Sequence, residues 1–269
     1  MYDLVTDNSF QIEKSFNYIL SIQVSLGGFS FSIVNPDEQR LLVLKNKQLT
    51  ISDDRFISRH FEEWFQSEEI FQHPFKQIRL IVLSEKFSIV PKEFYIKEKK
   101  REIINYLLDL GQHEVIARNS VEDFNSQLLF TLPPNLANVV NQPSFLHPVK
   151  ILIEKRPEVS AGTGLILWFS SSGIYLILYN KNQLLLANHF KITHDNDVIY
   201  YILTALKQLN ISLSETELYL GGELEHEGSL KKLLYNYFES VRFLTKDDNL
   251  IIDSEIFSQS MHPFILLFP

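Results

Sequence analysis

The sequence predicts an α/β protein made of two similar halves, and three observations support this class. Runs of alternating apolar and polar residues are interspersed with stretches in which apolar residues recur every three or four positions, a mixture typical of strands and helices in one chain. The order hairpin, third strand, helix, central strand, helix occurs twice. A repeat as long as roughly a hundred residues indicates a duplicated domain rather than a solenoid. Finally, the apolar run 218–220 stops at Gly221-Gly222, where the backbone can turn sharply into a further helix.

The first half begins with a β-hairpin. Residues 19–24 and 29–34 both alternate with a period of two, and Gly27-Gly28 lies at the turn between them, which is a strong hairpin signal. A third strand is expected over residues 40–45, after a turn at 35–37.

Two helices and a central strand follow in the first half. The first helix is expected to begin at a cap formed by Ser52 or Asp53, and residues 78–83 form an apolar run typical of a central strand. The second helix is expected to end before Gly111, a C-terminal cap glycine. Residues 112–145 contain three prolines, and we expect an irregular crossing between domains there. The apolar faces of the two helices are assigned to Phe56, Ile57, Phe61, Trp64 and Phe65, and to Ile103, Ile104, Leu107 and Leu108.

The second half repeats this order. Strands are expected over residues 165–169, 174–179 and 183–190, with a turn at 170–173 joining the first two. A helix begins near Asp195, and a last helix follows Gly221-Gly222. The apolar faces of these helices are assigned to Val198, Ile199, Ile202, Leu203, Leu206 and Leu209, and to Leu230, Leu233, Leu234, Tyr237 and Phe238.

Composition excludes several classes of function. The 269 residues are 45% hydrophobic and 22% charged, and the formal net charge is −8, so a surface that binds nucleic acid is not expected. The chain has no cysteine, which removes disulfides, thiolate nucleophiles and cysteine metal sites together. The apolar run 165–178 is interrupted by three serines and a glycine, so we expect no membrane insertion. A cytoplasmic protein is expected.

The doubled order, together with the turns at 27–28 and 170–173 and the loop Gly221-Gly222, resembles the superfamily of actin, sugar kinases and heat-shock chaperone ATPases. It is most similar to the divergent bacterial branch that includes cell-division and pilus-assembly actin-like proteins, and also resembles a bacterial family known as a domain of unknown function. The resemblance implies two ribonuclease-H-like lobes, residues 1–145 and 146–269, each a mixed sheet flanked by helices, around a central nucleotide cleft.

The two hairpins that would hold phosphates depart from the family pattern. The first reads Asp-X-Gly-Thr-Thr in such ATPases and matches residues 25–29 here, so Ser25 replaces the acid. The second reads Asp-Ile-Gly-Gly-Gly-Thr, and we match it to residues 168–173, so that Trp168 replaces the acid and serines replace glycines. The adenosine loop Gly221-Gly222 matches well.

Missing acids predict a loss of catalysis. Bound Mg²⁺ is normally held through carboxylates and phosphates, and losing one group that stabilises transition-state charge commonly costs about 3–4 kcal/mol of barrier. We therefore expect a non-catalytic, actin-like module that binds a protein partner and needs no cofactor, with Trp168 partly plugging the phosphate end. The alternative is an ATP-dependent ATPase or small-molecule kinase with atypical phosphate loops. The candidate degenerate nucleotide cleft consists of Gly27, Gly28, Ser170, Ser171, Ser172, Gly221 and Gly222.

Other candidate groups have a structural and a functional interpretation. The turn 170–172 is either a plain polar turn or a phosphate contact, and lacks the frame of a nucleophile elbow. Glu223, Glu225 and Glu227 either pair with a helix dipole or, by resemblance, contact a ribose. The apolar segment 87–95 either anchors an insert or offers a partner surface. The histidines are scattered without metal-ligand spacing, so no metal site is expected; they stand at 60, 73, 113, 147, 189, 194, 226 and 262.

Overall fold

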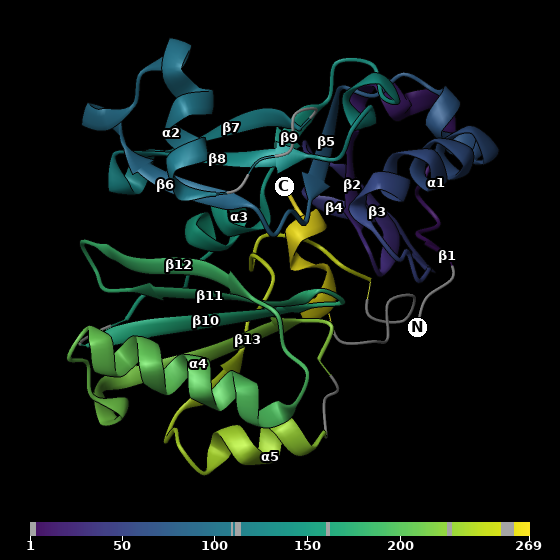
Figure 1. Cartoon of the computed structure of the whole chain (residues 1–269). Coiled ribbons are helices and arrows are strands. Elements are labelled where there is room, and N and C mark those ends of the chain that lie inside the picture. Colours follow the sequence, from purple (N-terminus) through teal and green to yellow (C-terminus); the bar gives the residue numbers. More distant parts are fainter. Residues whose placement is uncertain (1–3, 109, 111–113, 160–161, 225–227, 254–260) are drawn as a thin grey trace.

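Two β-sheets with equivalent strand orders carry the fold of the chain (Figure 1), described here from a computed structural model over residues 4–108, 110, 114–159, 162–224, 228–253 and 261–269. The first sheet has the order β1-β4-β3-β2-β5-β9 and the second β12-β11-β10-β13-β14. The strands of the first sheet are β1 (Leu4–Thr6), β2 (Ile19–Ser25), β3 (Gly28–Asn35), β4 (Arg40–Gln48), β5 (Gln77–Val82) and β9 (Ser144–Leu146). The strands of the second sheet are β10 (Thr163–Ser170), β11 (Gly173–Tyr179), β12 (Leu184–Phe190), β13 (Thr216–Gly222) and β14 (Val241–Phe243).

The two sheets match strand for strand. In each, a hairpin leads into a third antiparallel strand, a helix crosses over, and the next strand pairs in parallel with the first strand of the hairpin: β2 with β5, and β10 with β13. The crossover helices are α1 (Asp54–Ser67) and α4 (Asp195–Gln208). The repeated order predicted from the sequence is confirmed. The division at residue 145 stays a prediction; β9, which ends at Leu146, belongs to the first sheet.

Helix α1 forms as its periodicity predicts. Asp53 is its N-cap and accepts a hydrogen bond from the backbone N–H of Arg55 at 2.9 Å. Ile57, Phe61 and Trp64 are buried against the first sheet, and Trp64 stacks on Phe29 of β3 with ring centroids 5.2 Å apart. The assignment of Phe56 to this face is wrong, since its side chain is exposed beside the guanidinium groups of two arginines.

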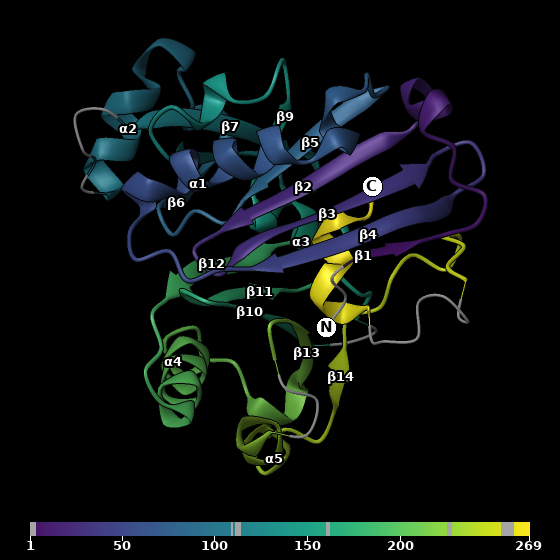
Figure 2. The ribbon, with the colours of Figure 1, turned by 90° about the vertical axis from the view of Figure 1, so that its right-hand side faces the viewer.

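Each face of the second sheet packs against a different layer. Helices α4 and α5 (Ser229–Tyr235) cover the outer face (Figure 1), where Leu167, Phe169 and Leu176 are buried. The inner face belongs to the same core as the first sheet. Helix α3 (Pro148–Glu154) and the 3-10 helix η8 (His262–Leu267) lie between the sheets (Figures 1 and 2). Ser32 of β3 donates to the carbonyl of Leu267 at 2.8 Å, and η8 also packs against β13, so this short helix ties the lobes together.

A third sheet corrects the prediction for residues 87–145. Residues 114–145 are not an irregular crossing, and the apolar segment 87–95 opens with a strand of this third sheet. Strands β6 (Phe87–Pro91), β8 (Ser126–Leu132) and β7 (Val115–Val121) form an antiparallel sheet in the order β6-β8-β7, with α2 (Lys100–Leu107) beside it (Figure 1). Gly111, the predicted cap of α2, lies outside the described residues.

The last helix is shorter than its apolar pattern predicts. Helix α5 ends at Tyr235, so Tyr237 and Phe238 follow the helix; Phe238 is buried and Tyr237 is exposed. None of the helices in the described ranges is long and apolar enough to cross a membrane.

Candidate functional site

The turns of the two hairpins occupy equivalent positions in the two lobes. Ser25 pairs with Gly28 across a two-residue turn, and Ser170 pairs with Gly173 in the same way. Each serine hydroxyl donates a hydrogen bond to the carbonyl of its paired glycine, at 3.1 Å in both turns. The two serines are therefore equivalent by strand register and by hydrogen bond.

This register corrects the match of Trp168 to the second family acid. The first acid matches Ser25, directly before the turn, so its equivalent in the second lobe is Ser170 and not Trp168. Trp168 lies two residues earlier on the same face of β10, because side chains alternate along a strand. Neither of the two equivalent positions carries a carboxylate.

The turns of the two lobes approach each other, as the resemblance implies. A Cβ atom added to Gly27 would lie 2.8 Å from the Cβ and Oγ atoms of Ser171, and 3.4 Å from Oε1 of Glu223, the residue after Gly222. A separation of 2.8 Å is too short for a real Cβ atom, so position 27 has no room for a side chain. The two lobes are therefore in contact where Gly27 faces Ser171. Surrounding atoms raise the pKa of the Glu223 carboxyl through desolvation, although the side chain still reaches solvent. Glu225 and Glu227 lie outside the described residues.

Gly28 and Gly222 shape their turns instead of facing the opposite lobe. Gly28 has φ of +127° and packs against the backbone of β4, where an added Cβ would lie 2.1 Å from the carbonyl oxygen of Lys47. Gly222 has φ of +84°, and its Cβ would lie 2.0 Å from the carbonyl oxygen of Phe169. Only glycine adopts such angles beside backbone without strain.

Trp168 fills the space behind the turns. Its side chain is 1% exposed, which confirms the prediction that it is shielded from solvent. A Cβ added to Gly221 would lie 2.8 Å from Cε3 of the indole and 3.1 Å from a methyl group of Leu244. The glycine at 221 is thus needed for the close approach of the indole, and this part of the predicted site is occupied by apolar side chains.

A row of buried polar groups crosses from one lobe to the other, which the sequence analysis missed. The hydroxyl of Tyr175 donates to the carbonyl of Ser84 at 3.1 Å, and Nε2 of His147 bonds the same oxygen at 2.9 Å. Because a carbonyl only accepts, Nε2 carries the proton; Nδ1 accepts from the backbone N–H of Val149. Burial lowers the pKa of His147 to about 3, so the imidazole is neutral.

His189 extends this row toward the turn of the second lobe. Its ring lies 4.8 Å from that of Tyr175, and its Nε2 is 3.3 Å from the hydroxyl oxygen of Ser172. Burial lowers the pKa of His189 to about 4. A nucleophilic serine needs a base that is itself oriented by a third group, and no carboxylate among the described residues is hydrogen-bonded to His189. No sequence signal joined Ser84, His147 and Tyr175, because they lie on separate elements.

The described residues include no group of three or more His, Cys, Asp or Glu side chains placed to hold a metal ion. Mg²⁺ is usually anchored through one or two carboxylates and the phosphates of a substrate. Among the described residues of the three turns, Glu223 is the one acid. Ser25 and Ser170, at the positions of the family acids, already donate their hydroxyl protons locally.

The family described as "Protein of unknown function (DUF3822)" matches residues 7–241. The chain belongs to the DUF3822 family. No curated protein matches it, whereas solved structures do. A Bacteroides thetaiotaomicron VPI-5482 protein with actin-like ATPase fold and unknown function is 22% identical, with a TM-score of 0.78 over 88% of this chain and 94% of that one.

Two further structures resemble this DUF3822 protein. The PilM-PilN type IV pilus biogenesis complex contains a chain 11% identical, with a TM-score of 0.57 over 93% of this chain and 96% of that one. The ethanolamine utilization protein EutJ from Carboxydothermus hydrogenoformans is 7% identical, with a TM-score of 0.50 over 98% of this chain and 93% of that one. At these identities the likeness shows the fold alone, and it confirms the predicted actin-like ATPase fold.

Proposed function

We propose that this DUF3822 protein is a non-catalytic actin-like module that acts by binding another protein. The observation that carries the proposal is the contact between Gly27 and Ser171. In an actin-like fold the phosphates of a nucleotide would lie between the two hairpin turns, and here these turns touch, with the Glu223 carboxyl beside them.

The chemistry of the turns supports the same proposal. Phosphoryl transfer depends on positioning and on electrostatic stabilisation of the phosphoryl oxygens, for which the metal is central. Serines stand at both acid positions, and a carboxylate beside the turns would repel a phosphate. Losing one group that stabilises charge commonly lowers the rate by two to three decades. The loss of both acids would therefore leave little ATP turnover.

A role in protein binding draws on the structural likeness to PilM. That protein forms the PilM-PilN type IV pilus biogenesis complex. An actin-like fold can therefore serve as a partner of another protein, and we extend this class of role to the present chain.

Release of phosphate from ATP tests the proposal. Purified full-length protein with Mg²⁺ is expected to release no more phosphate than a buffer control. Ser171→Arg would place a long side chain between the turns, and Ser214→Arg, a change at an exposed serine of the 3-10 helix Leu213–Glu215, is the matched control. Magnesium-dependent turnover in the wild type and in S214R, but not in S171R, would contradict a non-catalytic role.

A further inference from the structure

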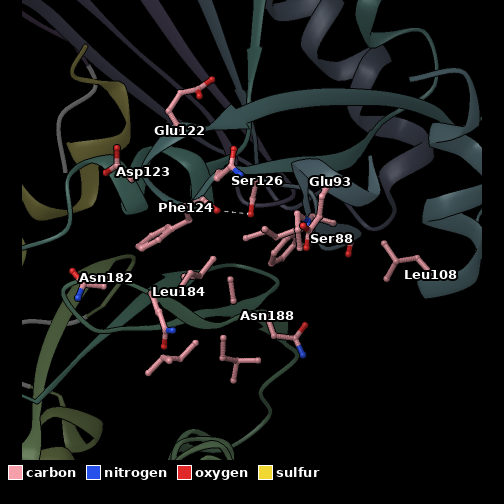
Figure 3. Close-up of a pocket in the computed structure, with 18 residues that line it drawn as sticks. Ser88, Glu93, Leu108, Glu122, Asp123, Phe124, Ser126, Asn182, Leu184 and Asn188 are labelled. Atoms are coloured by element: carbon pink, nitrogen blue, oxygen red, sulfur yellow. Dashed lines mark hydrogen bonds between the residues drawn. The ribbon is translucent and has the colours of Figure 1, made fainter. Parts of the chain in front are cut away.

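A groove lies between the three-stranded sheet and the second lobe (Figure 3), and its lining includes no described residue of the turns 27–28, 170–173 or 221–222. Its volume is about 950 Å³, and β6, the turn after β7 and β12 line it. Ser88 and Phe124 contribute from one side and Leu184 and Asn188 from the other. The groove is thus formed by both lobes together.

Both strands that border the groove are edge strands. β6 is the outer strand of the order β6-β8-β7, and β12 is the outer strand of the second sheet. An edge strand presents a row of backbone N–H and C=O groups that have no partner within its own sheet, which is a template for a further strand. The groove therefore offers main-chain hydrogen bonding along one of its walls.

The side chains of β12 give the groove an apolar wall. Residues 184–187 are all apolar and all half-buried. Leu184 and Ala187 pack against the inner core that both lobes share, whereas Leu185 and Leu186 pack against the outer core. A bulge at Leu185 separates Leu184 from Leu186 in the pairing with β11. A strand with one wet face would alternate apolar and polar residues. This one is apolar on both faces because both are covered, one by the inner core and the other by the outer core, while its outer edge pairs with no described strand of its own sheet.

The charged residues that line the groove indicate which kind of ligand it would bind. Its described lining includes three carboxylates and no lysine or arginine. Glu122 and Asp123 pair with Lys92 and Arg156 at the rim. Glu93 is exposed and has no basic partner among the described residues. A ligand that places a basic group near Glu93 is therefore favoured.

We infer that this groove binds an extended, basic segment of a partner protein, which adds as a strand to the open edge of β12. Main-chain hydrogen bonds would supply affinity, and alternate side chains would supply specificity, as in other complexes formed by strand addition. Apolar residues of the segment would contact Leu184, Ala187 and Ile89, and a lysine or arginine would reach Glu93. This inference rests on the proposed function, because it names the partner class and the surface of a protein-binding module.

Selection from a phage-displayed library of nine-residue peptides on the full-length protein tests this inference. The enriched peptides are expected to alternate apolar residues and to carry lysine or arginine. One of them, synthesised, is expected to slow hydrogen exchange at the amides of β12. Methylating the backbone nitrogens of alternate peptide residues should abolish binding in one register and not in the other, because a strand on an edge directs every second N–H to its neighbour.

Two pairs of variants locate the binding. Ala187→Trp fills the groove, and Ala137→Trp makes the same change at an exposed alanine outside it. Glu93→Lys reverses the charge at the rim, and Glu98→Lys reverses an exposed charge outside the lining. A187W and E93K are each expected to weaken peptide binding at least tenfold, with the controls unchanged. E93K alters an exposed residue, so it decides the matter even if A187W does not fold.

Three outcomes would overturn the inference. They are an absence of enriched peptides, peptides that bind A187W and E93K as tightly as wild type, and a concentration-dependent dimer that A187W abolishes. The last would assign the groove to a second copy of the chain. Turnover of ATP would contradict the proposed function without affecting these peptide measurements, so the two failures are distinguishable.

Discussion

Gly27 and Ser171 lie in equivalent turns of different lobes, and the first has no space for a side chain because the second occupies it: a Cβ at position 27 would lie 2.8 Å from the Cβ of Ser171. A direct contact between the turns has a measurable energetic consequence. Gly27→Val is expected to lower the free energy of unfolding by about 1–3 kcal/mol, the usual range for overpacking. Ser171→Gly should cost little alone and should recover part of that loss in the double variant.

Urea unfolding of the four proteins measures this coupling. Residues in contact typically show interaction energies of about 0.5–3 kcal/mol, whereas distant sites are additive within about half a kcal/mol. Strict additivity of G27V and S171G would mean that the turns do not touch in solution.

The row of polar groups between the lobes predicts a loss of stability in Tyr175→Phe. The variant removes the hydroxyl that donates to the carbonyl of Ser84 and keeps the ring that packs on His189. The expected loss is about 0.5–1.5 kcal/mol, the net value of a typical hydrogen bond. Tyr200→Phe, at an exposed ring on α4, is the control. Equal unfolding midpoints for Y175F and Y200F would argue against this hydrogen bond.

His147 predicts a pH dependence. Its pKa in the folded protein is about 3, below the value of about 6.5 expected in the unfolded chain. The unfolded state therefore binds the proton first as the pH falls. The contribution of the neutral His147 side chain to the free energy of unfolding is fully present above about pH 6.5. Below that pH it falls by about 1.4 kcal/mol per pH unit, until about pH 3.

The variant His147→Asn isolates this effect. Asparagine can still cap α3, as the His147 ring does now, but it does not titrate. Free energies of unfolding between pH 7 and pH 5 should fall less steeply for H147N than for wild type. His194→Asn, at the exposed N-cap of α4, should keep the wild-type slope. Equal slopes for all three proteins would contradict the assignment of a buried, neutral His147.

Trp168 predicts a spectroscopic signature. In a Trp64→Phe variant, its emission is expected to be blue-shifted and poorly quenched by iodide, because the indole is 1% exposed. It should also be unchanged by Mg-ATP, since the indole lies against Gly221 and Leu244. Circular dichroism would verify that the variant folds, because Trp64 donates to Glu68 at 3.0 Å. Red-shifted emission that responds to ATP would indicate an open, occupied cleft.

The duplicated hairpins were predictable from the sequence because their signals are local. The pairs Ser25–Gly28 and Ser170–Gly173 close two-residue turns between alternating strands. The match of Trp168 to an acid failed because a row of serines does not fix a register, whereas cross-strand pairing does. The resemblance predicted that the turns carrying Gly27 and Ser171 face each other. The short distance between these two residues is set by tertiary packing and could not be predicted.

Strand β7 could not be predicted because a polar residue within it is satisfied by distant partners. Asn119 interrupts the pattern of β7, yet its side chain donates to the carbonyl of Phe145 at 2.8 Å and accepts from the backbone N–H of His147 at 2.9 Å. The hairpin between β7 and β8 turns at Asn125, a residue with φ of +44°, without glycine. These are tertiary solutions with no local signature, and the groove beside β12 depends on them.

Isothermal titration calorimetry of Mg-ATP into the wild-type protein tests the non-catalytic proposal most directly. If Gly27 and Ser171 close the phosphate end, no saturable heat should appear beyond dilution, and ATP should leave the unfolding temperature unchanged. A ligand at 100 times its Kd would add about 2.7 kcal/mol of stability, which a thermal scan resolves easily. Saturable binding of one ATP per chain, retained in S214R and lost in S171R, would contradict the account.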